Sequence, residues 1–412
     1  MNKIQTREFI QQKFQEYYKE NSENIQSPNS FDEREFAFLL FKERVMLRHK
    51  GFKKIEALRN FLSSVAPSDV YYSSSYYEKP EEEMDAKGWI GADLIFDIDA
   101  DHIPTPCDKQ HDIWTCKNCA TSGLGFKPEK CPKCQFQKFD EISWPCGTCL
   151  ECAKDETIKL LDVLEQDFGF SPKEMILAFS GHRGYHVHIE HDSIKTLDST
   201  ARKEIVDYLI GLGLKPALQG FEKDMGPKLE DIGWRGRIAK GTYEFLLTTN
   251  QDQLKEIGLT KNTATLIDSK KEEILESWKG NGPWKMLKSV GMDSWEKIIR
   301  KGVDRQSVKI DTVVTTDVHR LIRLANTLHG GTGLKKVEIP ISKIEGFDPF
   351  KNAVAFNRGT LLIDVLAAPR FRLGDNSYGP YNNKRLELPT AAAMLLLCKG
   401  TAKIAEDTPL VR

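Results

Sequence analysis

The stretch LIFDIDADHIP, residues 94–104, places three aspartates at alternate positions immediately after a short apolar run. Side chains on a β-strand alternate between its two faces, so a strand here brings Asp97, Asp99 and Asp101 to the same face. The apolar start of the stretch predicts that this strand is buried. Because like charges at the end of a buried strand repel each other and lose hydration, these carboxylates need a positive partner.

Length and composition indicate a globular chain without a global charge signature. The 412 residues are 40% hydrophobic and 29% charged, with a net charge of −1, so any contact with nucleic acid must come from a local cluster of basic residues. The polar start MNKIQTREFIQQ contains no signal-peptide apolar segment, and no stretch approaches the roughly 18 apolar residues of a membrane span. We therefore expect an intracellular, cytoplasmic protein with no membrane partner.

Eight of the nine cysteines lie between residues 107 and 152, which indicates metal binding in a chain without a secretory signal. Two Cys-x-x-Cys pairs separated by 11 residues have the spacing of a zinc ribbon: Cys116, Cys119, Cys131 and Cys134. A second site can be formed by the remaining ligands Cys107, His111, Cys146 and Cys149, and Cys152 is an alternative to any one of these. Closed four-ligand sites are structural, so we expect one or two structural Zn²⁺ ions here.

Divalent cations would relieve the repulsion between Asp97 and Asp99. Mg²⁺ or Mn²⁺ binds one or two carboxylates together with substrate phosphates, and two ions roughly 4 Å apart can clamp both oxygens of a phosphoryl displacement. A third acid usually completes such a site, and we choose Asp311 because it lies in a short β-like run, KIDTVV. Asp317 is the alternative, but apolar residues at helical spacing over 318–328 predict a helix that Asp317 caps.

A metal-bound nucleotide also needs donors for its phosphates. Three phosphate-binding groups lie in the glycine-rich stretch SGHRGYHVHI: Ser180, Arg183 and His186. The stretch LHGGTGLK (328–335) adds His329, and Arg323 lies on the polar side of the helix predicted before it. The alternative for the first stretch is a tight hairpin with incidental polar groups.

Strand and helix patterns are mixed along the chain, which predicts an α+β fold. Strands are expected at 33–41, 69–74, 175–181 and 185–190, and helices at 1–20, 53–65, 151–169 and 199–212. Charge-rich helical patterns, with tryptophans at 278, 284 and 295, predict a helical subdomain over 215–300. We expect an α/β core at 1–106, 153–214 and 301–412, with a zinc-binding insertion at 107–152.

Taken together, five motifs in order resemble the catalytic small subunit of archaeal and eukaryotic DNA primase, closest to the archaeal form. They are REFAFLLF...MLRHKGF, DLIFDIDADH, the cysteine knuckle, SGHRGYH and DTVVTTDVHRLIRLANTLHGGTG, within residues 34–335. The resemblance implies a mixed-sheet core with an RRM-like palm, a zinc-binding insertion and a helical subdomain. It also implies DNA-templated synthesis of short RNA, or also DNA, primers from nucleoside triphosphates with two catalytic Mg²⁺ or Mn²⁺ ions.

The resemblance also assigns roles to residues. It places the catalytic ions on Asp97, Asp99 and Asp311, since the family's third aspartate precedes its motif histidine by 18 residues. It assigns nucleotide phosphates to Ser180, Arg183, His186, Arg323 and His329, adds Arg48, and matches the family's zinc knuckle to Cys107, His111, Cys146 and Cys149. The implied partners are a large regulatory subunit in a heterodimer, which carries an iron–sulfur cluster, a single-stranded DNA template, and NTPs or dNTPs.

Two departures from the family pattern and two rival functions remain. Ala325 stands where the family often has proline after Arg-Leu, and the ribbon at 116–134 exceeds the minimal knuckle. One rival is a primase-polymerase of repair or of a mobile element, which extends primers but starts chains poorly. The other is a non-catalytic zinc-ribbon protein that binds nucleic acid, which needs no acid pair opposite a phosphate-binding loop.

Overall fold

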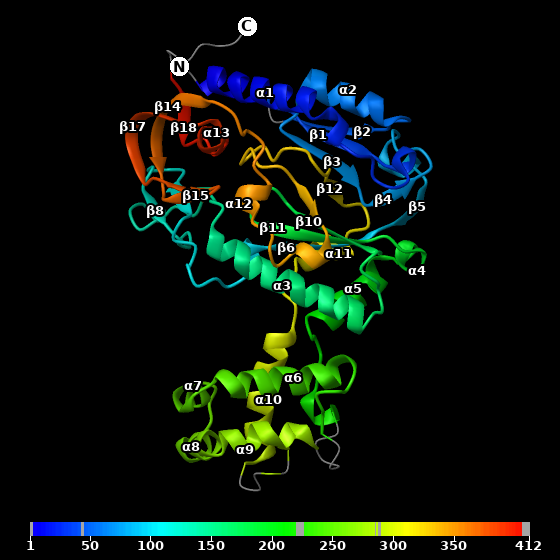
Figure 1. Ribbon diagram of the computed structural model, residues 1–412, viewed down its shortest axis with the longest axis vertical. Coiled ribbons are helices and arrows are strands. Elements are labelled where there is room, and N and C mark those ends of the chain that lie inside the picture. Colours follow the sequence, from blue (N-terminus) through cyan, green and yellow to red (C-terminus); the bar gives the residue numbers. More distant parts are fainter. Residues whose placement is uncertain (1–2, 43–44, 220–225, 285, 287–289, 406–412) are drawn as a thin grey trace. The chain divides into compact units, whose positions relative to one another are not determined.

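The structure is a computed structural model of the 412-residue chain, and it describes residues 3–42, 45–219, 226–284, 286 and 290–405. The chain forms two compact units, drawn in Figure 1. The α/β unit comprises Met1–Thr157, Pro172–Arg202 and Ile310–Arg412, and the helical unit comprises Ile158–Ser171 and Lys203–Lys309. The helical unit is thus larger than the predicted 215–300, because it also takes in 158–171, 203–214 and 301–309.

One antiparallel sheet of the α/β unit carries the aspartate stretch. Its strand order is β13-β10-β11-β6, with β6 at Leu94–Asp99, β10 at Met175–Phe179, β11 at Gly184–Ile189 and β13 at Val337–Ile339. The register pairs Asp97 with His186 and Asp99 with Gly184. Gly184 is required here, because an added Cβ would lie 2.3 Å from the carbonyl oxygen of Ile98. The two central motifs of the sequence therefore meet on neighbouring strands.

A second antiparallel sheet of this unit has the order β12-β3-β1-β2, with β1 at Phe36–Leu39, β2 at Met46–Lys50, β3 at Asp69–Ser73 and β12 at Leu321–Arg323. Strand β12 shows that the predicted helix over 318–328 is wrong. The helix lies earlier, as α11 at Thr312–Thr316, and Asp317 is its C-cap residue. Apolar residues at 321, 322, 324 and 328 fit a short strand with its following turn as well as a helix, so their spacing was ambiguous.

The remaining elements of the α/β unit surround these sheets. The predicted helices at 1–20, 53–65, 151–169 and 199–212 are confirmed as α1 (Lys3–Glu20), α2 (Ile55–Val65), α3 (Gly147–Gln166) and α5 (Ser199–Leu209), although α3 and α5 also run into the helical unit. Smaller elements are β4 (Ser75–Tyr77), β5 (Trp89–Ala92), α4 (Asp192–Lys195) and α12 (Pro349–Asn352). The α+β class is as predicted, but the strand pairs that the structure describes are antiparallel, so the mixed sheet that was expected is wrong.

A C-terminal layer was not predicted from the sequence. It consists of β14 (Thr360–Ala368), β15 (Phe371–Leu373), β16 (Asn376–Tyr378), β17 (Tyr381–Pro389), α13 (Thr390–Cys398) and β18 (Ala402–Ile404). Helix α13 is almost wholly buried and packs against β14, β17 and β18, and α1 packs against both α13 and β18. Segments from the two ends of the chain therefore pack together, as Figure 1 shows.

The cysteine-rich insertion is a three-stranded sheet of order β8-β7-β9, with β7 at Ile113–Cys116, β8 at Ser122–Leu124 and β9 at Phe139–Ile142. The helical unit contains α6 (Gly233–Thr248), α7 (Gln251–Glu256), α8 (Lys261–Ser269), α9 (Lys271–Glu276) and α10 (Met292–Gln306). Its three clustered tryptophans form a core, since Trp284 lies edge-on to both Trp278 and Trp295. Among the helices that the structure describes, none combines the length and apolar character needed to span a bilayer.

Candidate active site and metal centres

Three aspartates predicted to bind catalytic ions lie together in the α/β unit. Asp97 and Asp99 share one face of β6, and the backbone amide of Asp311 donates a hydrogen bond to the carbonyl oxygen of Asp97 at 2.9 Å. The expected β-like run at Asp311 is wrong, because Asp311 is the N-cap of α11 and its carboxylate accepts from the amide of Val313 at 2.9 Å. Helix α11 packs beside β6 (Figure 1), which explains how residues from distant parts of the sequence meet.

Asp101 does not continue the acidic face. Strand β6 ends at Asp99, and Asp101 lies in a 3₁₀ turn, where its amide donates to the Asp99 carboxylate at 2.9 Å. Its own carboxylate forms an ion pair with Arg183. The alternation predicted at 97, 99 and 101 therefore holds only for the first two aspartates.

The acids are held in an unfavourable electrostatic environment. Burial, followed by the neighbouring charges of Asp99 and Asp311, raises the pKa of Asp97 to about 7. Burial also raises the pKa of Asp99, although Arg183 opposes the shift. Buried carboxylates that repel one another offer oxygen ligands to a hard divalent cation, so this donor set fits Mg²⁺ or Mn²⁺.

We expect the Asp97 carboxyl group to destabilise the metal-free protein more as pH rises. A carboxyl group with a raised folded-state pKa contributes stability that is complete below its ordinary pKa of 3.8 and is lost as pH rises through about 7. Asp97→Asn removes this penalty, so with EDTA at pH 8 the variant should melt roughly 5 °C above wild type, and at pH 5 the gap should shrink. Thermal unfolding at both pH values, with and without Mn²⁺, measures the difference. A gap independent of pH would contradict a strained acid cluster.

A cavity of about 190 Å³ opens beside these acids. Among the described residues its lining comprises Tyr71, Ile95, Asp97, Asp99, Ser180, His182, His186, Val314, Arg320, Leu321, Ile322, Arg323 and His329. It therefore brings the acid pair together with four of the six residues predicted to contact nucleotide phosphates: Ser180, His186, Arg323 and His329.

The polar groups of this cavity are fixed by the loop that follows β10. The hydroxyl oxygen of Ser180 accepts from the amides of His182 and Gly184 at 3.3 and 3.2 Å. His186 lies on β11 with its Nε2 3.4 Å from Asp97 Oδ1. Burial lowers the pKa of both His186 and His329 well below the ordinary value. These imidazoles are therefore neutral hydrogen-bonding groups before a ligand enters.

Arg323 supplies a fixed positive charge to the same cavity. It lies on β12, opposite Tyr71 of β3, and its guanidinium bonds to Asp69 at 2.5 Å and to the carbonyl oxygen of Leu328 at 3.2 Å. The same Asp69 carboxylate accepts from the amide of Gly330, directly after His329, at 3.0 Å. Asp69 thus fixes the position of Arg323 relative to the turn that follows His329.

Two predicted nucleotide contacts are not in the cavity lining. Arg183 is 1% exposed, and its guanidinium binds Asp101 and both carboxylate oxygens of Asp112, the latter at 2.8 and 2.7 Å. Arg48, on β2, binds Glu35 at 3.0 and 3.3 Å. Glu35 is also paired with the buried Lys87. Both arginines thus have anionic partners within the chain, and their contact with a nucleotide stays a prediction.

Sequence reasoning missed several residues of the cavity. His182 is one of the lining residues, although it stands at an unassigned position of SGHRGYH. Tyr71 also lines the cavity and comes from a stretch predicted only as a strand. Lys399 does not line the cavity, but it contacts His182 from the C-terminal layer. A histidine between two glycines was a usable signal, whereas nothing in the sequence near Lys399 indicates proximity to this loop.

The cysteine and histidine ligands form two groups with the predicted membership. In each group the ligand atoms lie within 4.8 Å of one another: Cys107, His111, Cys146 and Cys149, and separately Cys116, Cys119, Cys131 and Cys134. Ligands at roughly 2.3 Å from Zn²⁺ in a tetrahedron are about 3.8 Å apart. Sulfur–sulfur distances of 3.4, 3.5 and 3.6 Å across the two groups fit this geometry. Cys152, the predicted alternative ligand, belongs to neither group.

Local backbone geometry supports the ribbon site. The residue after each Cys-x-x-Cys pair, Ala120 or Gln135, has a left-handed conformation with φ of 56° or 61°. Each amide donates back to the first cysteine of its pair, at 3.0 and 2.9 Å. The two knuckles therefore have the same turn, and this brings four thiols to one point.

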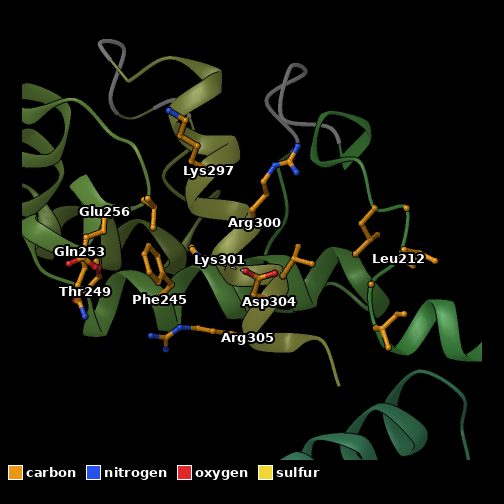
Figure 2. A pocket seen from close by; sticks show the side chains of 16 residues that line it. Leu212, Phe245, Thr249, Gln253, Glu256, Lys297, Arg300, Lys301, Asp304 and Arg305 are labelled. Carbon is orange, nitrogen blue, oxygen red and sulfur yellow. Dashed lines mark ion pairs between the residues drawn. The ribbon is translucent and has the colours of Figure 1, made fainter. Parts of the chain in front are cut away.

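A larger cavity lies elsewhere among the described residues. It has a volume of about 910 Å³ and lies in the helical unit, where Lys297, Arg300, Lys301 and Arg305 of α10 line one side (Figure 2). Glu256 and Asp304 also line it, and Lys301 is 3.7 Å from Asp304. None of the predicted catalytic or phosphate-binding residues lies there. The small cavity beside Asp97 therefore remains the candidate active site.

Comparisons with known proteins agree with the motif order. The family model described as DNA primase small subunit matches residues 140–342. The chain is 32% identical to the DNA primase small subunit PriS of Methanothrix thermoacetophila, over 97% of this chain and 99% of that protein. It is 34% identical to the protein of the same name from Archaeoglobus fulgidus and 30% identical to that from Nitrosopumilus maritimus, in both cases over 96% of this chain and 98% of the relative.

Proposed function

Because the chain belongs to the DNA primase small subunit family, we propose that it is the catalytic subunit that makes short primers on a DNA template for replication. The observation that supports this best is the meeting of Asp97, Asp99 and Asp311 beside a cavity lined by Ser180 and His329. Nucleotidyl transfer requires such a cluster of acids, which can bind metal ions, opposite side chains that can bind the phosphates of the nucleotide.

The residues divide the chemistry between them. Asp97, Asp99 and Asp311 would hold two divalent ions. When bound, such ions lower the cost of attack by a 3′-hydroxyl on an α-phosphate and stabilise the leaving pyrophosphate. Ser180, His186, Arg323 and His329 supply hydroxyl, imidazole and guanidinium groups for the triphosphate oxygens. The Asp69 contacts position Arg323 and the turn after His329 in advance, so little reorganisation is needed when the nucleotide binds.

The finer structural assignments follow from this function. We take the β13-β10-β11-β6 sheet as the RRM-like palm, because its β6 carries two of the acids and its β11 carries His186. We take both cysteine groups as structural Zn²⁺ sites, because each closes with four ligands. By family membership the chain would work as a heterodimer with a large subunit, on single-stranded DNA with nucleoside triphosphates.

Incorporation of a labelled nucleotide on single-stranded DNA without a primer tests this function. The purified chain is assayed with Mn²⁺ or Mg²⁺, alone and with its large subunit. We expect de novo products that require the divalent ion and disappear with EDTA. Extension of a supplied primer without de novo products in the heterodimer would favour the primase-polymerase alternative. Binding of DNA with no metal-dependent incorporation of either kind would favour the non-catalytic zinc-ribbon alternative.

A further inference from the structure

Lys399, the C-cap residue of α13 in the C-terminal layer, contacts the loop of the candidate active site. Its Nζ lies 2.9 Å from Nε2 of His182, and the hydroxyl of Ser143 lies 3.3 Å from the same nitrogen. His182 lines the cavity beside Asp97, whereas Lys399 is not among the lining residues. The contact between the lysine and the cavity therefore runs through the imidazole of His182.

The contact with Lys399 bears on which ring nitrogen of His182 carries the proton. When Lys399 is charged, its ammonium group donates hydrogen bonds and has no lone pair with which to accept one, so Nε2 is then the acceptor and Nδ1 carries the hydrogen. Burial, followed by the charge of Lys399, lowers the pKa of His182 well below its usual value, so the ring is neutral. Burial and Arg183 lower the pKa of Lys399 itself to about 7, while Cys398 and Asp112 oppose this. Phosphate oxygens in the cavity would favour its charged form.

The position of the His182 ring is fixed from its other side as well. The rings of His182 and His329 stack with centroids 5.0 Å apart and planes at 5°. Gly181 has φ of +88°, and an added Cβ there would lie 3.0 Å from Cβ of His329. The carbonyl oxygen of Gly181 accepts from Thr332 at 2.7 Å. The loops 180–184 and 328–335 are thus tied together with the two imidazoles parallel.

We propose that Lys399 is a positioning residue, which holds His182 in the Nδ1–H form so that this ring joins His329 as a second donor to the phosphates of the incoming nucleotide. This inference rests on the proposed function, since it names the substrate of the same cavity. It gives the C-terminal layer a role in nucleotide binding. Because Lys399 is 217 residues from His182 in sequence, no local motif contains both partners.

Lys399→Met removes the amine and keeps the aliphatic stem, so it tests the proposal. We expect KM for the nucleotide to rise roughly tenfold, the size of a lost hydrogen bond to a charged group, with kcat changed less than about twofold. Lys399→Arg keeps a charged donor and should recover most of the loss. Lys403→Met in β18 is the matched control and should leave both constants near wild type.

A double-mutant cycle separates positioning from a general structural effect. If Lys399 acts through His182, then Lys399→Met should add nothing to the KM defect of His182→Ala. Additive defects, or an unchanged KM in Lys399→Met, would overturn the proposal. Nitrogen chemical shifts of the His182 ring give a readout independent of activity, because Lys399→Met should release the ring to a mixture of tautomers. A wild-type heterodimer that fails to incorporate nucleotide would overturn the proposed function instead, and the tautomer measurement would still stand.

Discussion

Asp99→Asn is expected to reduce nucleotide incorporation at least roughly a hundredfold while the chain stays folded and its zinc content is that of the wild type. Asparagine preserves the shape of the side chain but removes the negative charge that a divalent ion needs. It can still accept the hydrogen bond that Asp99 receives from the amide of Asp101 at 2.9 Å, so the local turn should survive. The loss should therefore fall on catalysis.

Asp317→Asn is the matched control for this change. Asp317 lies at the C-terminal end of α11, accepts from the amide of His319 at 2.9 Å, and is not in the cavity lining. Asp317 is half-buried and lies outside the cavity lining, so the same substitution there should leave incorporation within about twofold of wild type. Incorporation assays on the heterodimer, with thermal unfolding and zinc content measured in parallel, decide the comparison. Residual activity above a few per cent in Asp99→Asn would remove the basis for its role as a metal ligand.

The choice between Asp311 and Asp317 shows where sequence reasoning succeeded and where it did not. The choice of Asp311 agrees with its place beside Asp97, but the reasoning from the local pattern had the wrong element at both residues. Asp311 is the helix N-cap and Asp317 follows the helix, the reverse of what apolar spacing predicted. Spacing over 318–328 suits either a helix or a short strand, and tertiary pairing with β3 decided the outcome.

Motifs located most of the cavity because each motif lies at the end of a strand that pairs with another. Asp97 and His186 are register partners, so DLIFDIDADH and SGHRGYH had to meet once β6 paired with β11. Contacts that join distant layers had no comparable signal. Lys399 reaches His182 only because α13 packs within the C-terminal layer, and Arg183 is occupied by Asp101 and Asp112, which sequence spacing does not relate to it. Such buried ion pairs depend on the tertiary fold.

The two cysteine groups should differ in their effect on activity. His111 of the first group bonds through Nδ1 to Asp112 at 2.8 Å, and Asp112 binds Arg183 at 2.7 Å. Arg183 in turn pairs with Asp101, whose amide bonds to Asp99. A continuous chain of polar contacts therefore links this group to Asp99, one of the proposed metal ligands. Metal bound here would fix the His111 ring and thereby the orientation of Asp112.

Cys149→Ser should therefore lower incorporation roughly 10- to 100-fold with loss of one zinc per chain, the usual effect of disturbing a metal site and its supporting contacts. Cys131→Ser removes a ligand of the ribbon group. The thiols of that group contact one another and Thr121, so this change should lower activity less than about threefold for the same loss of zinc.

Zinc content and incorporation, measured on both heterodimers, give the comparison. Equal losses of activity would mean that the ribbon also supports catalysis, and no loss in Cys149→Ser would mean that the contacts from His111 to Asp99 carry no constraint. A loss of activity in Cys149→Ser without a comparable loss in Cys131→Ser would show that the first metal centre orders the acid cluster through Asp112. The structural role of that centre and the arrangement of the active site would then be inseparable.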